Sequence, residues 1–411
     1  MYIFLIISLL ILLIINIILF KRQLVNPNCI FCGMLLLSAI FGLFWYNKWD
    51  LSSFSANSYL AIFLGCGSFS GASWIVHYLF YDKEEGGYNE RGPIEVSLPK
   101  FAIAFVFEIA TAIMSINFFG GFGGNISQAL IDYRVSVSYF NVDTMPLYLS
   151  LMINICLVNG IVSGYALANN TVFYKKIPIK WLVLTLLSIG ISLFGGSRGG
   201  AVSIFIATIM SFLSLIQKKY NGSYDKKKIY KFLNSLLITG VILATLFVES
   251  ANWIGRTVED GPMYYFAIYF SAPLKNLDLN IRDLDNGLHI TNTMFRSING
   301  HSLGNVGTVF TDEYMIGNYL GIIVISFIYG LLATLLYEII RYKRIETNCF
   351  SLALIIYSYI LFSVSMALFG NTMLISLTSM YAAKTLIGII VIVVAYSLKL
   401  KKGRILIEKW L

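Results

Sequence analysis

Long apolar runs alternate with short polar segments along the whole chain. A transmembrane helix needs about 20 consecutive apolar residues, and each run comes near that length. The pattern therefore predicts an all-α polytopic membrane protein with about 11 transmembrane helices, in which residues 1–411 form a single integral membrane domain. The predicted spans are residues 2–20, 28–46, 57–80, 99–119, 146–168, 181–195, 201–217, 231–248, 318–339, 348–368 and 381–398.

Composition agrees with a membrane protein. Hydrophobic residues make up 57% of the chain and charged residues 12%. A soluble domain carries about 25% charged residues, so this composition excludes one. The first run lacks a small-residue cleavage site, so we expect it to be a retained helix rather than a signal peptide. The five cysteines lie in or beside apolar runs and are expected to pack as small buried hydrophobes.

The distribution of basic residues predicts the orientation. The net charge is +9, and most of the 30 Lys and Arg residues fall in loops on one side of the predicted spans. Cytoplasmic loops carry an excess of Lys and Arg, so we place this side in the cytosol. The N-terminus is then outside and the C-terminus cytosolic. Basic residues distributed in this way indicate contact with membrane lipid and do not indicate nucleic acid as a partner.

Two segments on the opposite side differ from ordinary short connections. Residues 120–145 form one external loop, and residues 249–317 form a much larger one between the eighth and ninth predicted spans. Loops of such length are usually functional or disordered. The larger loop is rich in aromatic residues, so we expect it to fold as a partly helical external cap on the membrane face. Residues 263–277 are expected to be amphipathic or interfacial.

A short polar corner separates two apolar runs in the middle of the chain. Residues 195–200 read Gly-Gly-Ser-Arg-Gly-Gly and lie on the external side of the predicted topology. A guanidinium at a membrane boundary is costly, and its rigid fork of donors suits phosphate oxygens. The glycines allow a ligand to approach the backbone, and a helix that begins here directs its positive dipole end to this point. We interpret the corner as a pyrophosphate-binding site of a membrane enzyme; the alternative is a tight turn whose Arg198 reaches lipid headgroups.

The corner and three later segments resemble one known family. Residues 196–200 stand at the external end of a mid-chain span, and the large loop ends in Gly-Asn-Val-Gly-Thr-Val-Phe at 304–310. Gly-Asn-Tyr-Leu-Gly follows at 317–321, and the next span closes with Tyr-Gly-Leu at 329–331. In topology and in these motifs the chain resembles the bacterial O-antigen and oligosaccharide repeat-unit polymerases of the Wzy type. The resemblance in topology covers nearly the whole chain, whereas the motifs cover a small part of it.

The resemblance implies a GT-C-like fold, the multi-span architecture of glycosyltransferases that use lipid-phosphosugars. It implies a polymerase in the bacterial cytoplasmic (inner) membrane that joins oligosaccharide repeat units into O-antigen or capsular polysaccharide. Donor and acceptor are then both undecaprenyl-diphosphate-linked oligosaccharides on the outer face, with a chain-length regulator protein as a further candidate partner. The growing glycan moves from its lipid diphosphate to the non-reducing end of a new lipid-linked unit, and the diphosphate lipid leaves.

The resemblance also assigns candidate ligands of the diphosphate. By match to the corner motif, Arg198 is expected to bind it, with Ser197 and Gly199 beside it. The alternative for each arginine of the loops is an ion pair with a loop carboxylate. Further candidates for diphosphate binding are Arg134, Arg256 and Arg296.

Transfer to a sugar hydroxyl needs a group that accepts the hydroxyl proton, most often a carboxylate or a histidine. The candidates on the external side are Glu249, His289 and His301. Arginines that stabilise the leaving diphosphate do not require a metal, so we expect a metal-independent enzyme without a cofactor.

Three other functions stay open at this point. One is an O-antigen ligase, which moves finished glycan to a lipid A core, and another is a non-catalytic membrane scaffold. A lipid-linked oligosaccharide flippase or other transporter would have charged residues lining its spans and short loops at both faces. Charges within the predicted spans are few. Glu108 and Lys384 are two of them, and they could pair with each other, or Glu108 could carry protons.

Overall fold

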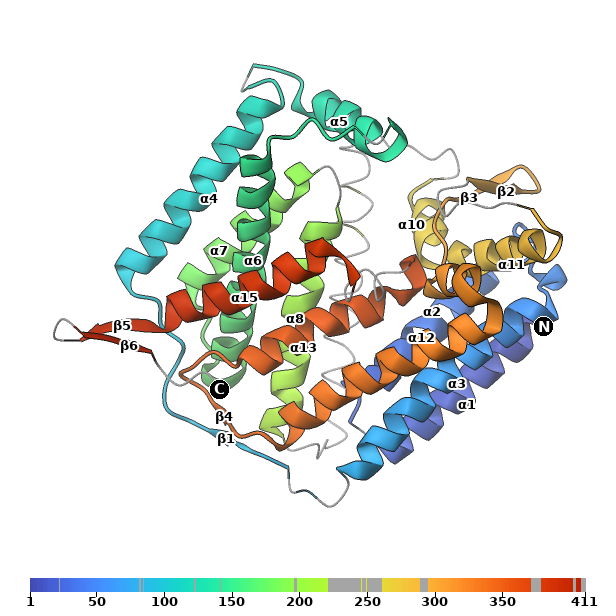
Figure 1. Ribbon diagram of the computed structural model, residues 1–411, viewed down its shortest axis with the longest axis horizontal. Coiled ribbons are helices and arrows are strands. Elements are labelled where there is room, and N and C mark those ends of the chain that lie inside the picture. The colour runs from blue at the N-terminus through green and yellow to red at the C-terminus, as the bar shows by residue number, and fades with distance from the viewer. Residues whose placement is uncertain are drawn as a thin grey trace.

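The computed structural model shows a bundle of long helices (Figure 1). It describes residues 1–411 except 22, 81–82, 84, 122, 141, 196–197, 221–244, 246–248, 250–260, 289–294, 371–377, 402–403 and 408–411. Within that description, nine helices are long and apolar enough to cross a membrane. They are α1 (Tyr2–Leu19), α2 (Pro27–Gly42) with the 3-10 turn η1 (Leu43–Trp45), α3 (Ala56–Leu79), α4 (Leu98–Phe118), α6 (Leu147–Tyr174), α8 (Gly199–Lys219), α12 (Val309–Tyr342), α13 (Leu352–Ser365) with η4 (Met366–Phe369), and α15 (Met380–Ser397).

Shorter helices and three two-stranded ladders make up the other described elements. The shorter helices are η2 (Leu51–Ser53), α5 (Ile126–Phe140), α7 (Ile179–Ser192) with η3 (Leu193–Gly195), α10 (Pro262–Phe270) and α11 (Ala272–Asp285). The ladders are β1 (Tyr88–Asn89) parallel to β4 (Ile345–Glu346), β2 (Arg296–Ile298) antiparallel to β3 (His301–Gly304), and β5 (Leu398–Lys401) antiparallel to β6 (Arg404–Ile407).

These elements confirm the predicted class, an all-α polytopic membrane protein. Predicted span 181–195 corresponds to α7 and η3, which form a shorter apolar helix. Predicted span 231–248 lies almost wholly outside the described residues, so the count of about 11 helices stays a prediction. Helices are present in both predicted external loops, α5 within residues 120–145 and α10 and α11 within residues 249–317. The predicted amphipathic segment is therefore helical, with a break at Ser271.

The structure differs from the sequence prediction at the start of the ninth predicted span. We placed that start at residue 318, but α12 begins at Val309. The helix is broken at Gly317 and Asn318, whose backbone angles are not helical, and Asn318 has a φ of 50°. Residues 309–316 therefore form a separate arm. Gly317 and Asn318 interrupt the apolar pattern of the sequence. For this reason the pattern did not predict a helix for the residues before them.

Polar residues just before the helices define where several spans begin. Asn26 accepts a hydrogen bond from the Cys29 amide at 2.8 Å, and Pro27 occupies the first turn of α2. Ser55 caps α3 and Ser379 caps α15 by accepting from amides three residues later, both at 3.1 Å. Such caps accept hydrogen bonds from amides that have no partner within the helix. An amide without a partner is especially unfavourable where a helix end meets lipid, because lipid offers no hydrogen-bond acceptor in the hydrocarbon region.

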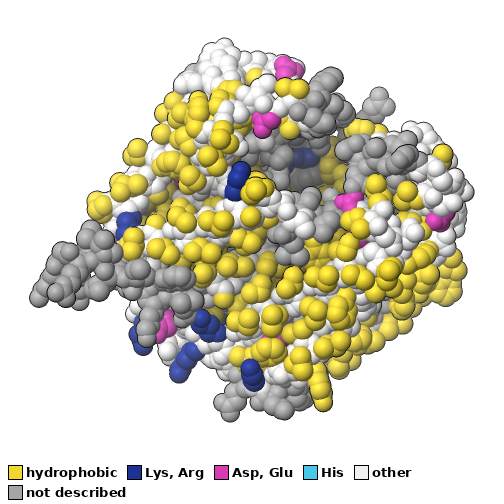
Figure 2. Space-filling view, in the orientation of Figure 1, with side chains coloured by type: hydrophobic (Ala, Val, Ile, Leu, Met, Phe, Trp, Pro, Cys, Tyr) yellow, Lys and Arg dark blue, Asp and Glu magenta, His cyan; other side chains and the backbone are white. Residues whose placement is uncertain are grey.

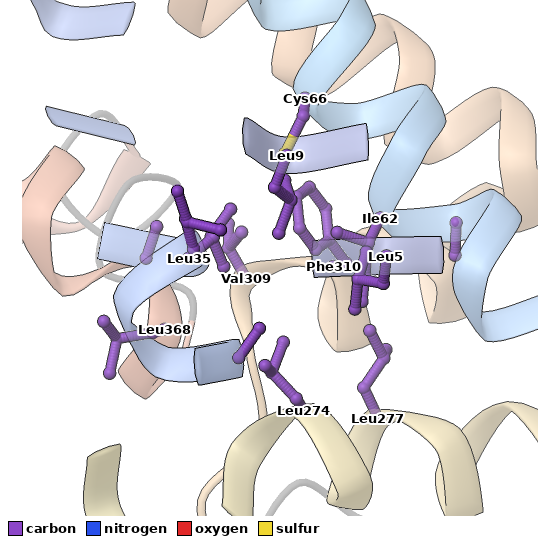
Figure 3. Packing of buried hydrophobic residues seen from close by; sticks show 14 of the residues in the cluster. Leu5, Leu9, Leu35, Ile62, Cys66, Leu274, Leu277, Val309, Phe310 and Leu368 are labelled. Carbon is purple, nitrogen blue, oxygen red and sulfur yellow. The ribbon is translucent and has the colours of Figure 1, made fainter. Parts of the chain in front are cut away.

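The helices pack around two main cores. One core joins α1, α2, α3, α10, α11 and the first part of α12; the other joins α6, α7, α8, α13, α15 and the far end of α12. Figure 3 shows side chains of the first core from α1, α2, α3, α11, α12 and η4 gathered near Phe310, which is fully buried. The chain thus consists of two helix groups, and we refer to them as the first and second groups.

The two ends of the molecule differ in composition. We call the end that carries α5, α10, α11 and the β2–β3 hairpin the cap end; it is at the upper right of Figure 1. In Figure 2, Lys and Arg side chains gather toward the lower left, away from the cap end, and hydrophobic side chains cover the middle. An apolar belt between polar ends is expected of a protein that spans a membrane.

A polar network at the end opposite the cap joins α8 to the far end of α12 and to the segment that follows α3. Lys218 of α8 donates hydrogen bonds to the carbonyl oxygens of Ile340 and Arg341 at 2.8 and 2.7 Å. Arg341 pairs with Glu85 at 2.9 Å and with Glu338 at 3.2 Å. Because these groups are mostly buried, each charge needs its partner to remain in place. The network fixes the C-terminal end of α8, and Arg198 lies at the N-terminal end of the same helix.

Close packing of α3 against α12 depends on Gly330. A Cβ atom at this position would lie 2.3 Å from the Phe69 carbonyl oxygen, which is backbone and cannot move without shifting α3. We expect Gly330→Ala to lower the free energy of unfolding in detergent by about 1–3 kcal/mol, measured by thermal unfolding. Gly71→Ala on α3 is the matched control, since nothing lies within 4 Å of its Cβ. Equal stability of the two variants would contradict this packing.

Candidate functional site

The Gly-rich corner connects α7 to α8 at the cap end. The chain passes from α7 through η3 to Arg198, which is the N-cap residue of α8; Gly196 and Ser197 lie outside the described residues. Gly200 lets α8 start close to its neighbours, because a Cβ there would lie 3.1 Å from side-chain atoms of both Leu157 and Ser192. The predicted helix start after Arg198 is confirmed, and Gly199 is exposed in the first turn.

Arg198 contacts two tyrosines of α10. Its Nη2 atom donates a hydrogen bond to the Tyr265 hydroxyl at 2.9 Å. The guanidinium carbon lies 5.7 Å from the centre of the Tyr265 ring and 5.4 Å from that of Tyr269, within the range of cation–π attraction. The Tyr265 hydroxyl donates to the Tyr269 hydroxyl at 3.5 Å. We call these three residues the arginine–tyrosine clamp.

The clamp joins the two helix groups across the cap end. Arg198 belongs to α8 of the second group, and both tyrosines belong to α10 of the first. Figure 2 shows a hollow between the α5–α6 side and α10, with a patch of Lys or Arg surface visible within it. The Tyr269 ring also lies 6.4 Å from that of Phe369 in η4. The described contacts of the guanidinium thus include two tyrosines at the cap end, and its planar fork of donors is of the kind that binds phosphate oxygens.

A second predicted ligand, Arg134, lies on α5 and is half-buried. The preceding residue, Tyr133, packs on Phe119 with ring centres 5.6 Å apart, and Phe119 stacks on Phe194 of η3 at 6.0 Å. These contacts place α5 beside the turn that leads into the corner. The structure therefore brings the segment that carries Arg134 to the same end of the molecule as Arg198.

Arg296 has a different environment. It forms an ion pair with Asp283 at 2.5 Å and donates to the Asn280 side chain at 2.8 Å. Both partners belong to α11, so this arginine attaches the β2–β3 hairpin to the cap helix. The contacts favour the alternative role that we gave each loop arginine, an ion pair that holds the loop together. Arg256 lies outside the described residues.

Two of the three candidate proton acceptors, Glu249 and His301, lie in the part of the chain that the structure describes. His289 lies outside the described residues, and Glu249 is exposed. His301, on β3, is half-buried, and its ring lies 6.1 Å from that of Tyr264. Tyr264 and Tyr265 are successive residues of α10 and point in directions about 100° apart, so His301 and Arg198 contact different sides of that helix.

The cap is held by a buried charge cluster. Its Arg282–Asp278 pair is of the kind that we gave as the alternative for the loop arginines, whereas the role of Lys275 was not predicted. Asp278 of α11 pairs with Lys275 at 3.0 Å and with Arg282 at 2.9 Å. It also accepts hydrogen bonds from the Ser55 amide at 2.8 Å and the Ser58 hydroxyl at 2.9 Å. Burial raises the pKa of Asp278, but the bonds from Ser55 and the charge of Lys275 outweigh it and hold the pKa below its usual value. The spacing of three and four residues between the charges was the available signal.

The buried carboxylate within α4 does not pair with Lys384. Glu108 accepts hydrogen bonds from Asn159 at 2.8 Å and Ser188 at 2.5 Å, and Asn159 accepts one from Tyr396. Lys384 is exposed near the start of α15, whereas Tyr396 is at its other end. The suggested Glu108–Lys384 pair is therefore wrong, because α15 presents its far end to Glu108.

Asp283 and Asp285, two carboxylates of α11 separated by one residue, both have protein partners. Asp283 pairs with Arg296, and Asp285 accepts hydrogen bonds from Tyr314 and Asn57, both at 2.8 Å. Within the described residues, no three His, Cys, Asp or Glu side chains are grouped so that they could hold a metal ion.

Comparisons of the chain with protein-family models, with curated proteins and with solved structures find no match.

Proposed function

We propose that the chain is a glycosyltransferase that polymerises lipid-linked oligosaccharide repeat units, and that Arg198 binds the diphosphate of the lipid carrier. The observation that carries this proposal is the arginine–tyrosine clamp, a guanidinium held by tyrosines at a Gly-rich helix start beside a hollow. Helix N-termini and arginines both favour phosphate groups. The motif resemblance to Wzy-type polymerases gives the substrate class, undecaprenyl-diphosphate-linked oligosaccharides as donor and acceptor.

The proposed reaction breaks the bond between the anomeric carbon of the donor glycan and the diphosphate oxygen. The acceptor hydroxyl oxygen forms the new bond to that carbon, and its proton passes to a carboxylate or imidazole of the protein. Glu249, His289 and His301 remain the candidates for this step. The electron pair of the broken bond stays on the lipid diphosphate, whose added negative charge Arg198 stabilises. Arg134 is a second candidate ligand because its helix lies at the same end.

The proposal places the protein in the bacterial cytoplasmic membrane with the cap end outside. The N-terminus would then be outside and the C-terminus cytosolic, as the distribution of Lys and Arg favours. A lipid diphosphate would reach the clamp from the outer leaflet, since the clamp lies at the first residues of α8, a helix long and apolar enough to cross a membrane. A chain-length regulator protein is a candidate partner on that side.

Removal of the Tyr265 hydroxyl tests whether the tyrosines orient the guanidinium. We expect Tyr265→Phe to lower the rate of polymer formation about fivefold, because one hydrogen bond contributes about 1 kcal/mol. The ring and its cation–π contact remain in this variant. Tyr148→Phe is the control, because Tyr148 is 56% exposed at the start of α6. Equal rates for both variants would show that the hydroxyl does not position Arg198.

Deletion of the gene in its host, followed by electrophoresis of surface glycan, tests the proposed function. A polymerase defect leaves glycan of a single repeat unit in place of the ladder of longer chains. A ligase or flippase defect removes the single-repeat material as well, and that outcome would favour the alternatives. An unchanged ladder would exclude a polymerase acting on this glycan. Restoration by the intact gene is required as the control.

A further inference from the structure

The first arm of α12 folds back on the rest of that helix. The Glu313 side chain and the Ser326 hydroxyl are 3.0 Å apart, although they are separated by 13 positions in the sequence. A straight helix would place residues this far apart at about 20 Å, so residues 309–316 must lie against the segment after the break. A Cβ at Gly321 would be 2.3 Å from the Glu313 carbonyl oxygen, which confirms the close approach. We call residues 309–316 the re-entrant arm.

Glu313 is completely buried in this arm. Its neighbour Phe310 packs on Gly65 of α3 and belongs to the core shown in Figure 3, where Cys66, Leu9 and Ile62 surround it. Ser326 donates to Oε2 of Glu313. Among the described residues, no Lys, Arg or His forms an ion pair with Glu313. A carboxylate that is ionised in such an apolar setting would be unfavourable by several kcal/mol.

Several buried oxygens beside Glu313 lack hydrogen-bond partners within the described structure. They include Oε1 of Glu313 itself, the hydroxyl of Tyr329 and the hydroxyl of Thr311. Tyr329 is three residues beyond Ser326 and therefore on the same face of α12. A proton on Oε1 of Glu313 would remove the buried charge and let this oxygen donate a hydrogen bond.

The titratable groups around Glu313 do not supply a compensating positive charge. Asp312 and Tyr329 lie near it on α12, and Cys66 lies near it on α3. Asp285 of α11 approaches the arm only at Tyr314, from which it accepts a hydrogen bond. Tyr329 and Cys66 are uncharged near neutral pH, and the negative charge of Asp312 favours the neutral form of the Glu313 carboxyl group.

We propose that Glu313 is a proton-binding site, and that its proton keeps the re-entrant arm docked against α3 and the rest of α12. Loss of the proton leaves an unpaired charge in the core and favours release of the arm. This site is separate from the arginine–tyrosine clamp and does not depend on the proposed glycosyl transfer.

Labelling with dicyclohexylcarbodiimide tests the site in the full-length protein in membranes. This apolar reagent reacts with protonated carboxyl groups in apolar surroundings. We expect mass spectrometry to find the adduct on Glu313 near neutral pH, with a yield at least about tenfold above that of an exposed carboxylate. Asp132, an exposed carboxylate of α5, is the matched control and should stay unlabelled. Absence of the Glu313 adduct at every pH would overturn the proposal.

Substitution by glutamine provides a second test, because Gln matches the size of the protonated acid and carries no charge. We expect Glu313→Gln to keep the thermal stability of the wild type within about 2 °C near neutral pH. The wild type should lose stability as the pH rises, and the variant should lose less. Strong destabilisation of the variant at neutral pH, or parallel pH profiles, would show that Glu313 is charged in the folded protein.

Discussion

Arg198→Ala should lower polymer formation by about 100-fold to 1,000-fold while the protein remains in the membrane at its normal level. In the proposed reaction the guanidinium stabilises negative charge on the departing diphosphate, and one such donor typically contributes about 3–4 kcal/mol to the transition state. The measurement is the rate of glycan polymer formation in membranes, with the amount of protein determined on the same sample.

A lysine at the same position separates charge from geometry. Arg198→Lys keeps the positive charge but loses the planar fork that can bind two phosphate oxygens, so its rate should stay well below that of the wild type. Arg344→Ala, at an exposed arginine beyond α12, is the matched control and should retain activity. Wild-type rates in both Arg198 variants would show that the clamp has a structural role alone.

Asp278→Ala should destabilise the cap by about 3–5 kcal/mol, because the fully buried Lys275 would lose the carboxylate that pairs with it. Thermal unfolding in detergent, together with proteolysis of the cap segment, measures the effect. Asp132→Ala removes an exposed carboxylate of α5 and serves as the control. Replacing both Lys275 and Asp278 by Met and Leu should recover part of the loss, since it removes both fully buried charges and leaves only the partly exposed Arg282 without this carboxylate.

The same carboxylate predicts an effect of acid on the cap. The pKa of Asp278 in the folded protein lies below its usual value, so its contribution to stability is complete above about pH 4. This contribution should disappear as the pH falls through the lowered pKa. In the Asp278→Ala variant that acid-induced part of the transition should be absent. Identical acid profiles for variant and wild type would contradict the assignment.

The transmembrane helices could be predicted because each depends on a local property, a long apolar run. The predicted starts at residues 57 and 381 are within one residue of the starts of α3 and α15. In both cases a capping serine, Ser55 or Ser379, precedes the helix. The re-entrant arm could not be predicted from the sequence, because its burial depends on the reversal of the chain at Gly317 and Asn318 and on contacts with α3. Sequence alone does not distinguish a short buried helix of this kind from a loop.

Within the candidate site, the position of Arg198 at a helix start was predictable, but its partners were not. Tyr265 is 67 positions away in the sequence, on a cap helix whose docking depends on tertiary contacts. The ion pair of Arg296 with Asp283 is more local and was weighed in advance as an alternative. The proton acceptor could not be chosen from sequence, since that choice requires the distances between loops that are far apart in the chain.

Binding of undecaprenyl diphosphate to the purified protein in lipid nanodiscs tests the central claim most directly. If Arg198 holds the diphosphate, Arg198→Ala should weaken this binding by at least about tenfold, the loss expected for a charge-assisted hydrogen bond of about 1.5–3 kcal/mol. Arg344→Ala should bind as the wild type does. Equal affinity of the wild type and Arg198→Ala for the lipid diphosphate would contradict the account.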